Sequence, residues 1–191
     1  MGQRSLTLTA LTGLPEIVPG MDLARLLLES ALRVHAGFEA GDVLLVGQKI
    51  ISKSEGRFVD LSGVRPGARA VELAAKCLKD PRLVELVLQE STEVVRCAPN
   101  VLIVRHRLGF VVANAGIDQS NVPGEDIALL LPVDPDDSAM RLRAGLAAAG
   151  GPQARGPAPA IIITDSFGRP FRQGVLGTAI GSAGLVVLKD L

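Results

Sequence analysis

The sequence predicts a globular protein built from both helices and strands, and three observations lead to this class. The apolar β-branched run at 161–163 is typical of a buried strand. Apolar residues recur at helical spacing in other segments, first over residues 23–34. The chain has 191 residues, of which 48% are hydrophobic, so it can bury a sizeable core.

The first part of the chain is predicted to run strand, loop, helix, strand. Residues 5–10 alternate polar and apolar side chains, as a strand does. A loop at 13–20 follows. It can line a ligand pocket or simply connect two elements. Asp22 is a good N-cap for a helix over 23–34, and 43–46 reads as a buried strand.

Later elements follow from the same patterns. Helices are predicted at 70–77, 82–91 and 138–149. Strands are predicted at 57–61, 92–97, 101–106 and 127–133, and the glycine-studded segment 175–188 fits a strand or a helix.

Polar side chains follow the strand at 161–163, where the chain is expected to reach solvent. Asp165 and Ser166 offer oxygen atoms that suit a hard divalent cation. Arg169 and Arg172 add positive charges that suit phosphate or carboxylate oxygens. The alternative is that Asp165 closes a turn and the arginines pair with surface acids.

A second strand exit repeats this arrangement. The stretch 109–121 leads from a buried strand through small residues to Asp118, with Asn121 three residues further on. Binding sites of open sheets assemble at strand ends, so Asp118 and Asp165 could share a divalent metal on a triphosphate. Two unrelated turn-closing aspartates are the alternative.

A third polar stretch follows the strand at 43–46. Lys49 and Lys53 are four residues apart, so a helical turn would place both ammonium groups on one side, where they could hold a nucleotide. The GxxxxGK[ST] spacing is absent, which excludes a Walker site. The alternative is a solvated turn in which Lys53 pairs with Glu55.

Other titratable residues are assigned structural roles. Asp136 and Asp137 are predicted to complement the start of a helix rather than to hold a metal. His106 lies between two arginines and is predicted to be a surface histidine. Three glutamates are predicted to be solvated: Glu85, Glu90 and Glu93.

The composition of the chain indicates which kinds of molecule it binds and where in the cell it is expected. Twenty basic and twenty acidic residues cancel, and there is no Trp or Tyr, which disfavours nucleic acid and favours a small ligand. Cys77 and Cys97 are expected to be reduced thiols. There is no secretory pattern and no apolar run of the ~18 residues that a membrane span needs, so a soluble cytoplasmic protein is expected.

Taken together, several motifs resemble the coenzyme F420:L-glutamate ligase family, the GTP-dependent γ-glutamyl ligases. The motifs are GLPEIVPGMDL, GDVLLVGQKIISKSEGR, DPRLVELVLQES, GFVVANAGIDQSNV, LLPVDPDDSAMRLR and TDSFGRPFRQG. The resemblance implies one γ-glutamyl ligase domain over residues 1–191, with the C-terminal part of the family domain missing. It also implies an α+β fold, a mixed sheet with flanking helices, unlike the Walker or ATP-grasp ligases.

The resemblance further implies an activity. Members of the family attach L-glutamate to the phospholactyl carboxylate of a deazaflavin coenzyme precursor and convert GTP to GDP and phosphate, with further γ-linked glutamates in some cases. They work as homodimers with Mg²⁺ or Mn²⁺ and with K⁺. Two alternatives stay open: a catalytically impaired binding or assembly fragment of that fold, and a metal-dependent phosphohydrolase.

The family's functional residues are carried over position by position. GTP is expected at Leu14, Pro15, Glu16, Ile17, Gln48, Lys49, Lys53 and Asn121. The metal is expected at Asp118, Asp165 and Ser166, where Ser166 replaces the usual threonine and keeps its hydroxyl. Arg169 and Arg172 are hypothesised to hold the acyl substrate or the incoming glutamate by bidentate pairing.

Overall fold

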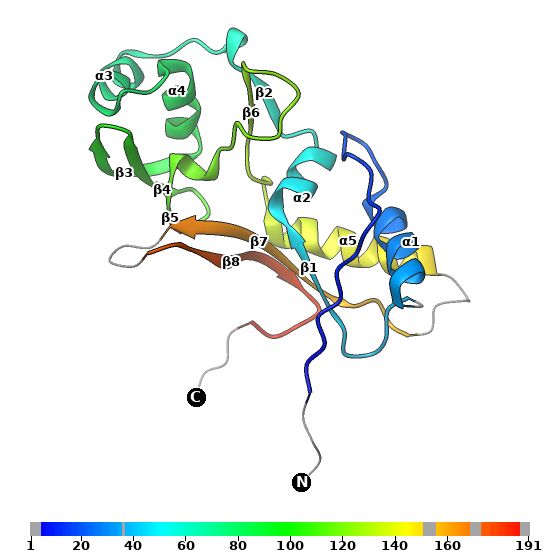
Figure 1. Ribbon diagram of the computed structural model, residues 1–191. Coiled ribbons are helices and arrows are strands. Elements are labelled where there is room, and N and C mark those ends of the chain that lie inside the picture. Colours follow the sequence, from blue (N-terminus) through cyan, green and yellow to red (C-terminus); the bar gives the residue numbers. More distant parts are fainter. Residues whose placement is uncertain (1–4, 36, 151–155, 169–172, 188–191) are drawn as a thin grey trace. The chain divides into compact units, whose positions relative to one another are not determined.

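The chain folds into two units, each with its own buried core. The computed structural model describes residues 5–35, 37–150, 156–168 and 173–187 (Figure 1). The first unit comprises Met1–Glu55, Val133–Thr164 and Ala179–Leu191, and the second comprises Gly56–Pro132 and Asp165–Thr178. Two strands, β7 and β8, contribute residues to both units.

The first unit is built around the start of β7. Its helices are α1 (Leu23–His35), α2 (Gln48–Ser54) and α5 (Pro135–Gly150). The strands of its sheet are β1 (Val43–Gly47), β7 (Ala160–Gly168) and β8 (Val175–Ala183), in the order β1-β7-β8. β1 and β7 are parallel, whereas Figure 1 draws β7 and β8 in opposite directions. The predicted α+β class with a mixed sheet and flanking helices is confirmed.

Small residues let the elements of the first unit approach closely. Ile161 and Ile163 of β7 are fully buried. A Cβ added at Gly145 of α5 would lie 2.8 Å from the Cβ of Ala24 in α1. A Cβ added at Gly181 of β8 would lie 2.4 Å from the carbonyl group of Pro135. Glycine at these two positions is therefore a condition of the packing.

The second unit combines two antiparallel sheets with two helices. The helices are α3 (Ala68–Cys77) and α4 (Pro81–Gln89), and two short 3₁₀ turns are η1 (Leu61–Gly63) and η2 (Asn114–Gly116). One sheet pairs β2 (Phe58–Asp60) with β6 (Ile127–Leu129). The other has the order β3-β4-β5 and consists of β3 (Ser91–Ala98), β4 (Val101–His106) and β5 (Val111–Ala113).

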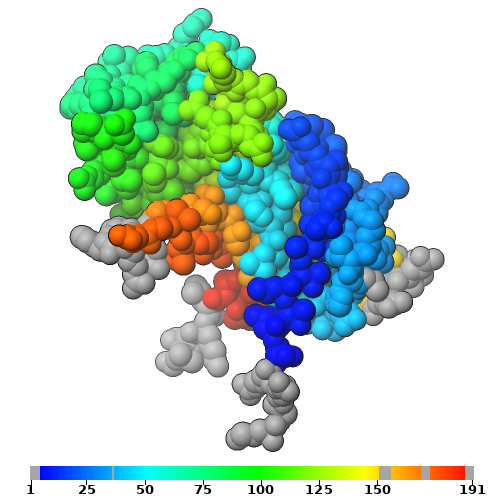
Figure 2. Space-filling model, in the orientation of Figure 1, coloured from blue at the N-terminus to red at the C-terminus, as the bar shows by residue number. Residues whose placement is uncertain are grey.

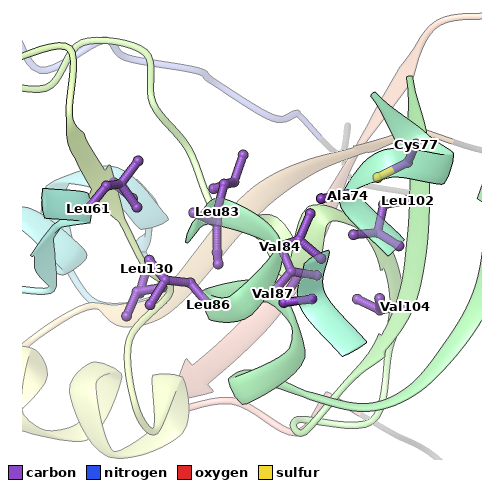
Figure 3. Close-up of a cluster of buried hydrophobic side chains, with 14 residues drawn as sticks. Leu61, Ala74, Cys77, Leu83, Val84, Leu86, Val87, Leu102, Val104 and Leu130 are labelled. Atoms are coloured by element: carbon purple, nitrogen blue, oxygen red, sulfur yellow. The ribbon is translucent and has the colours of Figure 1, made fainter. Parts of the chain in front are cut away.

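The core of the second unit lies where α3 and α4 pack against β4 (Figure 3). Leu102 and Val104 alternate along β4 and present one buried face. Cys77 of α3 and Val84 and Val87 of α4 belong to the same buried cluster. Aliphatic side chains form this core, as a composition with 3% aromatic residues requires.

Aspartates begin three helices. The carboxylate of Asp22 accepts a hydrogen bond from the Arg25 N–H at 3.0 Å, which confirms the predicted cap of α1. Asp80 caps α4 ahead of Pro81. Asp134 caps α5 by accepting from the Asp137 N–H at 3.0 Å. Asp136 and Asp137 lie in the first turn of α5, where their charges complement the start of the helix as predicted.

Three sequence predictions were wrong in detail. Residues 5–10 form no strand, and Leu6 and Leu8 are 87% and 84% exposed. β1 buries only one face, since Leu45 is 60% exposed. β7 does not end at 163 but continues to Gly168, so Asp165 and Ser166 lie within the strand. Hydrophobicity alone does not tell a strand with two covered faces from one with a bare face.

Two further findings concern the thiols and the helices. Cys77 and Cys97 are both free. Burial and the neighbouring Cys97 thiol raise the pKa of Cys77 above its ordinary value. Within the described ranges, no helix is long and apolar enough to cross a bilayer.

Candidate nucleotide and metal site

In the first unit, the loop at residues 13–20 lies against the C-terminal end of α2. The Gly20 N–H donates to the carbonyl oxygen of Ser54 at 2.9 Å and ties the loop to that helix. Gly13 and Gly20 both have positive φ angles, 72° and 81°, which glycine adopts without strain. Ile17 is buried and anchors the loop in the core of this unit.

Lys53 is a buried cation with a distant partner. Its side chain is only 9% exposed, and its Nζ lies 3.9 Å from Oε1 of Glu16, whose side chain is 77% exposed. Among the described residues no other acidic group forms an ion pair with Lys53. Buried ammonium groups need close counter-charges, so this position suits an incoming anion. The predicted alternative, a pairing of Lys53 with Glu55, is wrong, because Glu55 pairs with Arg141 at 2.7 Å.

Gln48 and Lys49 open α2, directly after β1. Gln48 is 3% exposed, and its side-chain oxygen accepts a hydrogen bond from the Ser52 hydroxyl at 2.9 Å. Lys49 is half-buried. Lys49 and Lys53 therefore lie on one helix, the condition under which they were expected to share a side. The loop tied to this helix contains Leu14, Pro15, Glu16 and Ile17.

Asp118 follows an unusual turn in the second unit. Asn114, Ala115 and Gly116 have positive φ angles of 50°, 55° and 68°, and a Cβ on Gly116 would lie 2.8 Å from Leu131. Left-handed backbone costs a residue such as alanine ~1 kcal/mol, and strain of this kind gathers at functional sites. After this turn, the backbone of Asp118 exchanges two hydrogen bonds with that of Leu129, since the N–H of each residue donates to the carbonyl oxygen of the other.

A backbone N–H two residues further along the chain orients the Asp118 carboxylate. Its Oδ1 accepts a hydrogen bond from the Ser120 N–H at 2.6 Å, which is an Asx-turn. The side chain is half-buried. Asn121, the predicted nucleotide contact, is exposed with φ of 60°.

Asp165 and Ser166 belong to the same unit as Asp118. Asp165 is half-buried, and its Oδ1 accepts a hydrogen bond from the Ser166 N–H at 2.8 Å. Ser166 is exposed on the opposite face of β7. Arg169 and Arg172 lie outside the described residues.

In the described part of the chain, no group of three or more His, Cys, Asp or Glu side chains could hold a metal ion. The metal, nucleotide and substrate roles of these residues stay predictions.

A partly buried charge cluster in the second unit was not predicted from the sequence. Glu90 is 16% exposed and lies 3.0 Å from Nε of Arg107 and 3.5 Å from Arg57. Nε2 of His106 lies 3.7 Å away, too far for a hydrogen bond but close enough for an electrostatic contact. His106, Arg107 and Arg57 together lower the pKa of Glu90 to about 2.

His106 is not a surface histidine, because its side chain is fully buried. Its Nδ1 accepts a hydrogen bond from the Leu108 N–H at 3.0 Å, so the ring proton is on Nε2 and faces Glu90. The ring stacks on Phe110 with centroids 5.0 Å apart, and Phe110 also contacts Phe167 of β7 at 5.0 Å. This stack supports the strand next to Ser166.

A signal for the buried histidine exists in the sequence. Leu102, Val104 and His106 are spaced two apart along one strand, so they share the buried face of β4. The predicted solvation of Glu90 was wrong for the same reason, because Glu90 faces this histidine and two arginines. The arginines on either side of His106 suggest exposure, whereas its position in the two-residue repeat of β4 indicates burial.

Comparison with known proteins places the chain in a family. The family model described as F420-0:Gamma-glutamyl ligase matches residues 13–191. The chain is similar to proteins named coenzyme F420:L-glutamate ligase from three archaea. It is 43% identical to that of Methanopyrus kandleri over 175 residues, 92% of this chain and 65% of the relative. It is 38% identical to that of Methanothermobacter thermautotrophicus over 185 residues, 97% of this chain and 71% of the relative. It is 46% identical to that of Archaeoglobus fulgidus over 178 residues, 93% of this chain and 67% of the relative.

The chain spans about two thirds of the length of these relatives. Since the family model covers nearly all of its 191 residues, the chain belongs to the F420-0:Gamma-glutamyl ligase family.

Proposed function

We propose that this chain carries out GTP-dependent ligation of L-glutamate to the coenzyme F420 precursor, with release of GDP and phosphate and with possible further γ-linked glutamates. The observation that supports this most is the match to proteins named coenzyme F420:L-glutamate ligase over 92–97% of the chain. The buried Lys53 beside the loop at Glu16 supports a nucleotide at α2.

The ligation needs an activated carboxyl group, because a carboxylate does not condense readily with an amine. In the proposed reaction the carboxylate of the precursor attacks the γ-phosphorus of GTP, and GDP leaves. The glutamate amine then attacks the resulting acyl phosphate, loses its proton and expels inorganic phosphate. Lys53 would bind phosphate oxygens and offset the charge that develops on them.

The family resemblance assigns a hard divalent cation to three residues of the second unit, although the side chains of Asp165 and Ser166 point to opposite faces of β7. Asp118, Asp165 and Ser166 offer carboxylate and hydroxyl oxygens, the donors that Mg²⁺ and Mn²⁺ prefer. A metal bound there would offset negative charge on the substrate oxygens that it contacts.

Other features of the proposal come from the family resemblance. They are a homodimer, a K⁺ ion, a cytoplasmic location, and roles for Arg169 and Arg172 in holding the acyl substrate or glutamate. They stay predictions.

The activity is tested by incubating the 191-residue chain with GTP, L-glutamate, Mg²⁺ or Mn²⁺, K⁺ and the F420 precursor, and by mass spectrometry of the product. We expect a gain of one glutamyl unit that requires GTP and glutamate together. Phosphate release without glutamate would indicate a phosphohydrolase instead. Ligand binding without turnover would indicate a binding or assembly module.

The role of Lys53 is tested by Lys53→Met, which keeps most of the length of the side chain and removes its charge. We expect the KM for GTP to rise at least tenfold, because a phosphate contact is lost. The melting temperature should change little, because removing a poorly paired buried charge costs little stability. The matched control is Lys76→Met on α3, whose side chain is 59% exposed and pairs with Glu72. An unchanged KM in Lys53→Met would remove Lys53 from the nucleotide site.

A further inference from the structure

In the part of the chain that the structure describes, one edge of β1 has no partner strand, and a groove runs along it. It has a volume of about 680 Å³ and is lined by all five residues of β1, Val43–Gly47, and by the five consecutive residues 7–11. Neighbouring side chains of a strand point to opposite faces, so a cavity that touches every residue of β1 follows its backbone edge. The other edge of β1 is paired with β7.

β1 is an edge strand among the described elements, and its apolar side chains are poorly covered. Leu45 and Val43 are 60% and 46% exposed. Proteins usually cover or blunt such edges, because unpaired backbone groups attract another strand. A bare apolar edge therefore indicates a place for a further extended segment.

The second wall of the groove is also extended chain without a pairing partner. Residues 5–10 have the alternating sequence of a strand, yet they form no ladder in the structure. Leu8 lines the groove and is 84% exposed. The segment to which it belongs is dark blue in Figure 2. Two strand-like segments thus line one gap, and neither reaches the other to pair.

The chemistry of the lining favours a peptide over a nucleotide. Among the described residues that line the groove there is no Lys or Arg to hold phosphates. The polar lining side chains are those of Thr7, Thr9, His35 and Asp42, and most of the others are apolar. Exposed backbone edges beside apolar side chains are the features that bind an added β-strand.

The length of the relatives points to the source of such a strand. The match takes in 92–97% of this chain but only 65–71% of the relatives, which therefore contain further segments. We propose that the groove binds an extended segment with alternating apolar residues, which pairs with β1 and fills the space beside residues 5–10. We further propose that this segment belongs to the part of the relatives outside their match to this chain. The inference does not depend on the proposed nucleotide chemistry.

The test uses the 191-residue chain and overlapping synthetic peptides that cover the unmatched part of the Archaeoglobus fulgidus ligase. We expect one peptide to bind and to slow amide hydrogen exchange at residues 43–47 and 5–10, measured by mass spectrometry. Leu45→Lys and Leu8→Lys should weaken its binding at least tenfold, because each places a charge in the groove. Both side chains are largely exposed, so circular dichroism should show an unchanged fold.

The matched control is Val95→Lys on β3, which is 48% exposed and lies in the second unit. It should leave peptide binding unchanged. Protection at other residues, equal binding by Leu45→Lys, or no binding by any peptide would overturn the proposal. It would also be wrong if the chain alone sediments as a dimer with residues 43–47 already protected, because the occupant would then be a second copy.

Discussion

At the scale of single residues, Glu90 shows how a buried charge can support a fold. It is held in the ionised form by His106, Arg107 and Arg57, and its pKa is about 2 instead of 4.5. A carboxyl group with a lowered pKa in the folded state stabilises the protein above its unfolded pKa. This contribution disappears as the pH falls through the folded value.

We therefore expect the free energy of unfolding to fall as the pH is lowered from about 4.5 toward 2, with a contribution from Glu90 on the order of 3 kcal/mol. Glu90→Gln should remove most of this dependence and lower stability at neutral pH, since it leaves two arginines without their carboxylate. Urea unfolding followed by circular dichroism measures both effects, because the chain has no Trp or Tyr to report by fluorescence. The control is Glu93→Gln, at a glutamate that is 58% exposed, and an equal loss there would refute the role of Glu90.

At Asn121, a substitution by glycine can remove the side chain while keeping the backbone conformation. Its φ of 60° is in the left-handed region, which glycine adopts freely. Asn121→Gly should therefore keep the turn and the melting temperature, while the KM for GTP rises at least tenfold if its amide contacts the nucleotide. Asn100→Gly in the β3–β4 hairpin, with φ of 61°, is the control and should change neither quantity. Equal kinetics for the two variants would exclude Asn121 from the site.

At the scale of elements, the contact between α1 and α5 depends on one missing methyl group. Alanine usually stabilises a helix relative to glycine by ~1 kcal/mol. At position 145 the added Cβ would lie 2.8 Å from that of Ala24, so we expect Gly145→Ala to destabilise the protein by ~1–3 kcal/mol instead.

The double variant Ala24→Gly with Gly145→Ala should recover much of this loss, because it reverses the two side chains at the contact. Thermal or urea unfolding measures each step. Ala147→Gly, at an exposed position of α5, should lower the free energy of unfolding by ~1 kcal/mol. It measures the intrinsic difference between alanine and glycine in this helix, without a packing contribution. A Gly145→Ala variant more stable than the original chain would show that α1 moves aside at no cost.

Elements with strong local signals were predictable from the sequence. α1, α4 and the β3–β4 hairpin were expected within a few residues, because caps, prolines and turn residues mark their ends. Residues 5–10 show the opposite case. Their alternation is that of a strand, but a strand needs a partner, and local pattern does not say whether one is present.

At the scale of the whole molecule, the sequence indicated the class of fold and the family but not the division into two units. The units are formed by segments distant in sequence, such as Gly56–Pro132 with Asp165–Thr178. Such long-range grouping leaves no local pattern. The candidate site shows the same limit, since the helical turn at Lys49 and Lys53 was predictable, whereas the contact of Lys53 with Glu16 was not.

Two glycines of β8 carry opposite constraints on future sequence change. Gly181 lies against the backbone of Pro135, and the neighbouring Ser182 N–H donates to Asp136, so the start of α5 rests directly on this strand. Gly177 has nothing within 4 Å of where a Cβ would be. A saturation library selected for folded protein should thus return only glycine at the first position and almost any amino acid at the second.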